Sequence, residues 1–336
     1  MLARRATPPA SPKTPMKSLL FALLLLVASC PALHAYPGDP RPIHDPSTII
    51  WCNNEYWLFA TGRGIDSWHS GNLLSWRPGP PVFTDFPSWI TQIDPTQHGN
   101  FWAPDIVFTN GQYRLYYAVS KWASNSSAIA LATNPTLDPF DPGSHWTDSG
   151  IVIRTTGGDD FNAIDPSILI DTDSRIWMAF GSFWSGIKLV ELNPATGLRK
   201  SGAPVYPLAH AKEIEAPCII SHQGSYFLFV NWGLCCRGIY STYNIRVGRA
   251  TRVTGPYLDK NGIDMRSGGG TLFLGNEGPR IGPGQAGIFR DGANDWLSYH
   301  YYDANRNGAP ALGIRRLAWD PTGWPLPGPI APVSFR

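Results

Sequence analysis

The sequence predicts an all-β fold, and within that class a five-bladed β-propeller. Glycine and proline are abundant, at 34 and 32 of 336 residues, and apolar residues do not recur with the 3.6-residue period of long helices. Short aromatic-rich segments with strand-type alternation recur instead. Recurrence of one unit along a chain is typical of propellers and solenoids. The length suits five blades of four strands each.

Each of the five repeats contains one strand core that is rich in apolar or aromatic residues. The cores are Tyr56–Phe59, Tyr113–Tyr116, Ile176–Ala179, Tyr226–Phe229 and Asp295–Ser298. The residues eleven positions before these cores are, in the same order, Asp45, Trp102, Asp165, Glu215 and Gly284. Successive positions in this series lie 57, 63, 50 and 69 residues apart. These intervals exceed a minimal four-stranded blade, so we expect inserted loops.

A first strand and a turn are expected between each counted position and its core. Residues 45–50 and 165–170 both begin Asp-Pro-Ser, and residues 215–220 carry a proline at their third position. Residues 102–107 also have a proline there, and the Asn110-Gly111 pair that follows them favours a hairpin turn. A proline near its start suits the first position of a strand.

Three of the five counted positions are carboxylates: Asp45, Asp165 and Glu215. One Asp-Pro pair alone more often starts a turn than serves a site. The first strand of a propeller blade lines the central channel, however, so three acids in one register would repel one another there. We therefore interpret them as functional. Two such carboxylates suffice to hydrolyse a glycosidic bond, about 6.5–9.5 Å apart in the inverting case, and the third raises the pKa of its neighbour.

Residues 1–35 resemble an export signal, and residues 36–336 then form the propeller domain. Lys13 and Lys17 precede an apolar run that is too short to span a bilayer, and Leu33-His34-Ala35 offers a cleavage site. A lipoprotein signal ending at Cys30 is the alternative. Removing the leader takes away four basic residues and no acid, which changes the net charge from +2 to −2. Nucleic acid is therefore not an expected partner, and the protein is expected to be secreted, without a membrane span.

Four cysteines follow the predicted leader: Cys52, Cys218, Cys235 and Cys236. An even number in an exported chain permits disulfides. The adjacent pair, Cys235 and Cys236, either closes a vicinal disulfide or consists of two small, half-buried residues. The sequence leaves both alternatives open, as it does the pairing of the other two.

Several segments together resemble family 43 of the glycoside hydrolases, and within it the endo-1,5-α-L-arabinanases. They are His44-Asp45-Pro46-Ser47, Phe101-Trp102-Ala103-Pro104-Asp105, Asn162-Ala163-Ile164-Asp165-Pro166, Gly181-Ser182-Phe183-Trp184, Ile214-Glu215-Ala216-Pro217 and Tyr299-His300-Tyr301-Tyr302-Asp303. The resemblance extends from about Asp45 to Trp324. It implies a five-bladed propeller that cleaves internal α-1,5-L-arabinofuranosyl linkages of plant cell-wall arabinan with inversion.

The resemblance also assigns roles to individual residues. Asp45 matches the general base, Glu215 the general acid, and Asp165 the carboxylate that tunes the acid's pKa and orients the substrate. The three positions that match the lining of the arabinan groove are Trp102, Asn162 and Ser182. His300 matches a histidine near a metal ion, usually calcium, which is bound through water in the central channel. Relatives often carry histidine at the position of Gln285, so this residue departs from the pattern.

Two alternatives to an endo-acting enzyme remain. The first is another activity on the same fold: an exo-acting arabinanase, an arabinofuranosidase or a β-xylosidase, in which loops block one end of the groove. The second is a non-catalytic sugar-binding propeller, which would have no need for three carboxylates in one register. Under all of these readings a monomer is expected, because a propeller buries its own strand edges.

Overall fold

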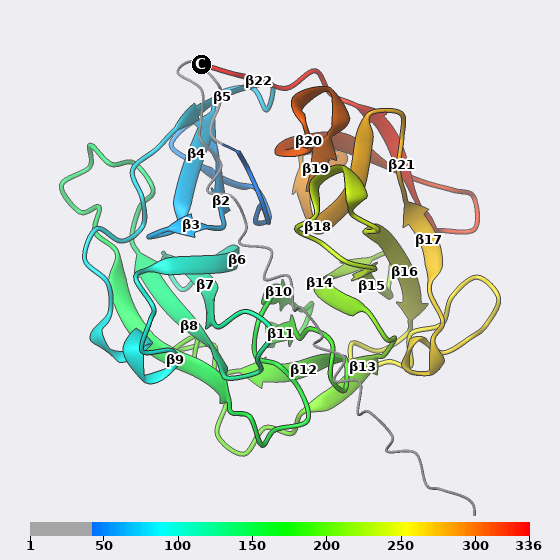
Figure 1. Ribbon diagram of the computed structural model, residues 1–336, viewed down its shortest axis with the longest axis horizontal. Coiled ribbons are helices and arrows are strands. Elements are labelled where there is room, and N and C mark those ends of the chain that lie inside the picture. The colour runs from blue at the N-terminus through cyan, green and yellow to red at the C-terminus, as the bar shows by residue number, and fades with distance from the viewer. Residues whose placement is uncertain (1–41) are drawn as a thin grey trace, which may run out of the picture. The chain divides into compact units, whose positions relative to one another are not determined.

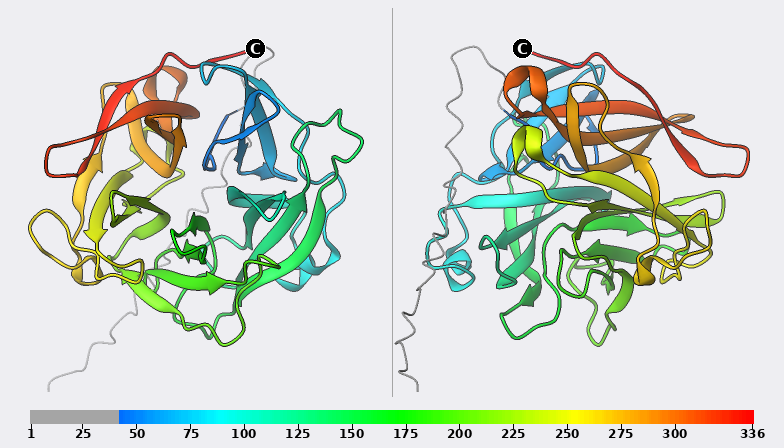
Figure 2. Two further views of the ribbon diagram at one scale, coloured as in Figure 1. Left: turned by 180° about the vertical axis from the view of Figure 1, so that it is seen from behind. Right: turned by 45° about the vertical axis from the view of Figure 1, so that its right-hand side comes forward.

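Residues 42–336, the part of the chain that this computed structural model describes, form five mainly antiparallel sheets arranged as the blades of a ring (Figure 1). Their innermost strands contact one another around the centre. Figure 2 shows the same ring from behind and from the side. The described residues contain no α-helix, only four short 3₁₀ helices. The prediction of an all-β, five-bladed propeller is confirmed.

The blades follow one another in chain order, except that one short strand, which lies between two strands of blade 1 in the sequence, pairs with blade 2, and the last strand of the chain returns to blade 1. Blade 1 consists of β1 (Ile50–Cys52), β2 (Glu55–Ala60), β4 (Asp66–Ser70), β5 (Ser75–Pro78) and β22 (Ser334–Phe335). Blade 2 consists of β3 (Gly62–Arg63), β6 (Asn100–Thr109), β7 (Gln112–Ser120), β8 (Ser127–Asn134) and β9 (Thr147–Thr155). Blade 3 consists of β10 (Ser167–Ile170), β11 (Ile176–Phe180), β12 (Ile187–Leu192) and β13 (Tyr206–Ala209).

The last two blades have four strands each. Blade 4 consists of β14 (Ile214–His222), β15 (Ser225–Trp232), β16 (Asn244–Ala250) and β17 (Thr271–Leu274). Blade 5 consists of β18 (Arg280–Asp291), β19 (Asn294–Asp303), β20 (Ala309–Trp319) and β21 (Pro325–Ile330). The 3₁₀ helices are η1 (Ser88–Gln92), η2 (Gly238–Tyr240), η3 (Met265–Ser267) and η4 (Ala304–Arg306).

The five aromatic-rich cores predicted from the sequence are the second strands of the five blades: β2, β7, β11, β15 and β19. Their side chains are largely buried because both faces of a blade pack against neighbouring blades. Blades 1 and 5, for example, share a cluster that contains Leu58, Trp76, Leu312 and Ile314. Apolar packing between blades therefore supplies much of the driving force for closing the ring.

The structure resolves the alternatives for the cysteines. Cys235 and Cys236 form a vicinal disulfide in the loop after β15, while Cys52 and Cys218 are buried free thiols on blades 1 and 4. Within the described range, no helix is long and apolar enough to cross a membrane. The predicted leader, residues 1–35 with Cys30, lies outside the described residues.

The last strand, β22, joins the chain's end to blade 1, where it pairs in parallel with β5. Phe335 packs edge-on against Trp68, with ring centroids 5.4 Å apart. We expect Phe335→Ala to lower the free energy of unfolding by about 1–2 kcal/mol, because it removes a half-buried aromatic contact at the ring closure. Urea denaturation would measure the loss. Phe140→Ala is the matched control, since Phe140 is 92% exposed, and an equal loss in both variants would contradict the prediction.

Candidate active site

The innermost segment of every blade contains one residue other than glycine with left-handed backbone conformation. These residues are Asp45 (φ 50°), Ala103 (φ 42°), Asp165 (φ 58°), Ala216 (φ 52°) and Gln285 (φ 54°). In the first four blades the next residue is proline. Residues other than glycine rarely adopt positive φ, and clusters of them mark sites where the surrounding structure enforces an unfavourable backbone. The five equivalent positions therefore define one ring at the mouth of the channel.

This ring corrects the register deduced from the sequence by one residue in blades 2, 4 and 5, where the counted residues Trp102, Glu215 and Gly284 each precede the left-handed residue. Asp45 and Asp165 occupy the left-handed position, but Glu215 precedes it and is equivalent to Trp102 instead. In blades 2 and 4 the ladder is interrupted by a β-bulge directly after Trp102 and Glu215. Counting back a fixed eleven residues from the second strand missed this offset, because the left-handed residue lies eleven residues before the core in blades 1 and 3 and ten residues before it in blades 2, 4 and 5. The bulge re-aims the side chain, and Glu215 still reaches the two aspartates.

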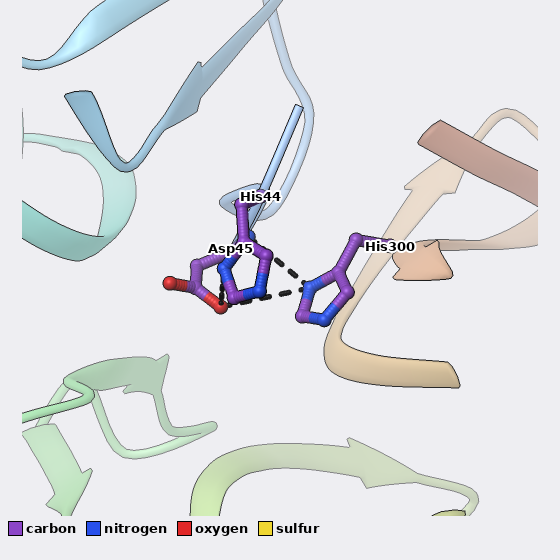
Figure 3. Close-up of side chains that lie close together, drawn as sticks. All are labelled: His44, Asp45 and His300. Atoms are coloured by element: carbon purple, nitrogen blue, oxygen red, sulfur yellow. Dashed lines mark hydrogen bonds and ion pairs between the residues drawn. The ribbon is translucent and has the colours of Figure 1, made fainter. Parts of the chain in front are cut away.

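Asp45 lies between His44, which precedes it in the chain, and His300 of blade 5 (Figure 3). Its Oδ1 lies 2.8 Å from Nδ1 of His44, and its Oδ2 accepts a 2.7 Å hydrogen bond from the Thr61 hydroxyl. The main-chain N–H of Asp45 donates to Nδ1 of His300 on β19, over 3.2 Å. The two imidazole rings stack with centroids 4.0 Å apart. Asp45 is thus held by its own blade and by blade 5.

These contacts decide the ionisation of Asp45. Burial alone would raise its pKa, but the charge of the adjacent His44 and the hydrogen bonds from His44 and the Thr61 hydroxyl outweigh burial and lower the pKa to about 2. Burial lowers the pKa of His44, whereas the Asp45 charge more than compensates and raises it. Asp45 is therefore a carboxylate at neutral pH, as a general base must be.

Glu215 and Asp165 lie in a different environment, where hydroxyl and main-chain groups are the hydrogen-bond partners and the charge of His44 acts on Glu215 without a direct ion pair. Ser182 donates to Oε2 of Glu215 over 2.7 Å, and the Tyr243 hydroxyl donates to Oε1. Asp165 accepts the main-chain N–H of Ala216 at 3.0 Å, which links the two acidic segments directly.

Both pKa values are raised here. For Asp165 the causes are burial and the charges of Glu215 and Asp45. For Glu215 burial comes first and the Asp45 charge adds to it, while the hydroxyls of Tyr243 and Ser182 oppose the rise. The site therefore combines an ionised carboxylate with a close pair of acids that retains a proton.

The other predicted residues occupy distinct places. Trp102 is half-buried at the start of β6, so one part of its indole is accessible. Asn162 is buried, and its amide oxygen accepts a 2.6 Å hydrogen bond from Ser127. The Ser182 hydroxyl donates its hydrogen bond to Glu215. That these three residues contact substrate stays a prediction. Asn162 and Ser182 are buried, and their side chains support the site from beneath its surface.

Three residues beside the carboxylates were not predicted from the sequence. His44 directly precedes Asp45 in the Asp-Pro-Ser repeat, so its position next to the carboxylate was a usable signal. Tyr243 falls within a segment that resembles the arabinanases, residues 241–249, but nothing in its pattern indicated a contact with Glu215. Thr61 carried no signal at all.

Comparison with known proteins identifies the family. Residues 40–325 match the profile of glycosyl hydrolases family 43. The chain belongs to this family. It is 41% identical to an extracellular exo-α-(1→5)-L-arabinofuranosidase of Cellvibrio japonicus, over 92% of this chain and 91% of the relative. It is 39% identical to an extracellular endo-α-(1→5)-L-arabinanase of Bacillus subtilis, over 91% and 94%. A solved α-L-arabinanase of Cellvibrio cellulosa, complexed with arabinohexaose, superposes with a TM-score of 0.81 at 38% identity, over 85% and 95%.

Family membership and site geometry point to the same chemistry. A glycoside hydrolase of the two-carboxylate type needs one group that accepts a proton from water and another that donates a proton to the leaving oxygen. Asp45 has the low pKa of the first, and the Asp165–Glu215 pair has the raised pKa of the second. The opposite pKa shifts follow from their different neighbours.

The raised pKa of Asp165 carries a cost in stability. The folded protein binds this proton more tightly than the unfolded chain does, so the ionised form destabilises the fold as pH rises through the folded pKa. We expect Asp165→Asn to raise the free energy of unfolding at pH 7 by about 1–2 kcal/mol. The gain should shrink towards pH 4, and the amide oxygen can still accept the Ala216 N–H. Urea denaturation at both pH values tests this, with the exposed Asp173→Asn as control. Destabilisation at pH 7 would contradict it.

Proposed function

We propose that this protein hydrolyses internal α-1,5-L-arabinofuranosyl linkages of arabinan with inversion at the anomeric carbon. The observation that carries the proposal is the pairing of an ionised carboxylate, Asp45, with a proton-retaining acid pair at one channel mouth. The arabinan-directed activities for which the two relatives are named support arabinan as the substrate. The arabinohexaose bound to the Cellvibrio cellulosa structure supports a groove for several sugar units.

In the proposed reaction, Asp45 accepts a proton from a water molecule as the water attacks the anomeric carbon. The His44 contact and the Thr61 hydroxyl hold the Asp45 carboxylate in a fixed orientation while the proton moves. Glu215 delivers its proton to the leaving glycosidic oxygen. Asp165 keeps that proton available, because the two acids titrate as a pair in which the ionisation of one disfavours the ionisation of the other. Water and proton donor act on opposite faces of the sugar, which gives inversion.

Exposed indole rings near this mouth suit sugar binding. Trp122 is 70% exposed and Trp184 is 42% exposed. They lie in the loops that follow β7 and β11, which are the second strands of blades 2 and 3. Rings of this kind stack on the apolar faces of sugars. Together with the half-buried Trp102, they would extend the binding surface over several units along the groove.

An exo-acting arabinanase is the second candidate, favoured by the 41% identity to the Cellvibrio japonicus exo-enzyme. Exo action needs a groove that loops close at one end, whereas endo action needs both ends open. We propose secretion for either activity, because both relatives are extracellular. The vicinal disulfide also suits an oxidising compartment.

Hydrolysis of linear debranched arabinan by the purified protein tests the proposal. We expect oligosaccharides of mixed length early in the reaction, and the β-anomer as the first product by time-resolved NMR. A single short product from the start would favour the exo enzyme. Binding of arabinan without cleavage, with xylan also uncut, would contradict catalysis and favour the sugar-binding module.

Substitution of the carboxylates tests their roles. Asp45→Asn and Glu215→Gln should each lower kcat by at least about 10²-fold, the contribution typical of one general acid or base. Asp173→Asn, an exposed carboxylate at the β10–β11 turn, is the control and should keep full activity. Variants of Asp45 or Glu215 with unchanged kcat would contradict the assigned chemistry.

We also propose that the channel binds a metal ion, calcium being the expected one, beside His300. The Nε2 atom of this buried histidine has no hydrogen-bond partner in the described part of the chain. His44, Asp45 and His300 bring their ligand atoms within 4.8 Å of one another. Calcium prefers oxygen ligands, so a mainly water-coordinated ion that faces one imidazole suits this donor set. Its charge would favour the ionised form of Asp45.

Metal removal provides the test. Dialysis against EDTA should lower the melting temperature by several degrees, since an ion bound only to the folded state stabilises it. Added calcium should restore the melting temperature. In His300→Gln both effects should disappear, and calorimetric binding should weaken. His222→Gln, in the stack with Trp319, is the control. Equal calcium binding by wild type and His300→Gln would contradict the site.

A further inference from the structure

Asp105, on β6 of blade 2, has a carboxylate that the proposed reaction does not use. The residue is buried, with 5% of its surface exposed. Its Oδ1 accepts the main-chain N–H of Thr48 at 3.1 Å, and its Oδ2 accepts that of Ile168 at 2.8 Å. Thr48 belongs to blade 1 and Ile168 to blade 3. One side chain therefore joins the blades on either side of its own.

The two N–H groups that Asp105 binds hold equivalent positions. Thr48 lies three residues after Asp45, and Ile168 lies three residues after Asp165. Both intervening segments read Pro-Ser, and proline has no N–H to contribute. Asp105 therefore binds the segments that carry two active-site carboxylates at equivalent positions, three residues after the left-handed residue of each.

A carboxylate buried at this position costs free energy of folding. Burial raises the pKa of Asp105 to about 6, although the N–H groups of Ile168 and Thr48 oppose the rise. No ion pair within residues 42–336 offsets its charge. A single link between neighbouring blades needs no charge: the Ser167 hydroxyl accepts the Ile219 N–H at 3.1 Å between blades 3 and 4. What a carboxylate adds is two acceptors on one rigid plane.

We propose that Asp105 is a positioning residue that fixes the separation between Asp45 and Asp165 by holding both of their strands. The inference rests on the proposed function, because it gives the spacing of these two groups a catalytic meaning. Asn at this position has the same shape but one acceptor and one donor, so its NH₂ would face one of the two N–H groups. One strand would then be released.

The test compares Asp105→Asn with wild type on linear arabinan. Since a displacement of about 1 Å can cost about 10²-fold in rate, we expect kcat to fall about 10- to 100-fold. KM should stay within about 3-fold, because the sugar-binding surface lies elsewhere. A kcat within twofold of wild type, or a change in KM alone, would overturn the inference.

Tyr226→Phe is the matched control. The Tyr226 hydroxyl, on blade 4, donates to both oxygens of Asp171 on blade 3, over 2.7 and 2.9 Å. This is also a link between blades through a carboxylate, but it lies at the turn between β10 and β11, away from the three acids. The control should lose melting temperature and keep kcat. An equal fall in kcat in both variants would mean that any loosening of the ring impairs the reaction, which would overturn the inference.

Asp105→Glu covers the case in which the asparagine variant does not fold. It keeps two acceptors at the end of a side chain one methylene too long, so we expect a folded protein with reduced kcat. If neither variant folds, the carboxylate serves the fold as a whole and the inference is overturned. The wild-type assay separates the two proposals. An inactive wild type would contradict the proposed function, whereas an Asp105→Asn variant with unchanged kcat would contradict this inference alone.

Discussion

Three carboxylates gathered at one mouth of the channel, with Asp165 and Glu215 buried and Asp45 partly exposed, are the constraint on which the rest of the site depends. Like charges in a medium of low dielectric repel strongly, so all three cannot be ionised without compensation. The protein compensates Asp45 with the directly adjacent His44 and the Thr61 hydroxyl, and gives Glu215 hydrogen bonds from the hydroxyls of Ser182 and Tyr243. This asymmetry in neighbours, rather than any difference between Asp and Glu, separates the pKa values.

The ring that brings these groups together is held by two kinds of interaction. Apolar clusters between blades are non-directional and set no fine spacing. Directional hydrogen bonds between inner strands do, as where the Ile219 N–H of blade 4 donates to the Ser167 hydroxyl of blade 3. The five left-handed residues at the mouth cost backbone energy, and this network of bonds between blades is what makes them persist.

Much of the fold could be predicted from the sequence because each blade repeats the same local signals. Each signal consists of residues that are close together in the chain: turn residues, a proline near the start of the first strand, and an aromatic second strand. Such local patterns can be recognised from the sequence alone. The exact ring position of Glu215 could not be predicted, because a β-bulge shifts the ladder without leaving a compositional mark. The resemblance indicated His300. The contacts of Tyr243 and Thr61 with the carboxylates join segments that are separated in the sequence, so only the folded structure shows them.

The one-residue offset of Glu215 has a chemical consequence. Asp45 and Asp165 project from equivalent backbone positions with short side chains, whereas Glu215 starts one residue earlier and has an additional methylene. The residue at the equivalent left-handed position of its own blade is Ala216, whose N–H is bound by Asp165. An acid that projects from a different backbone position, and is tied to its partner by that bond, can approach the glycosidic bond from another direction than the base. Inversion requires two such directions.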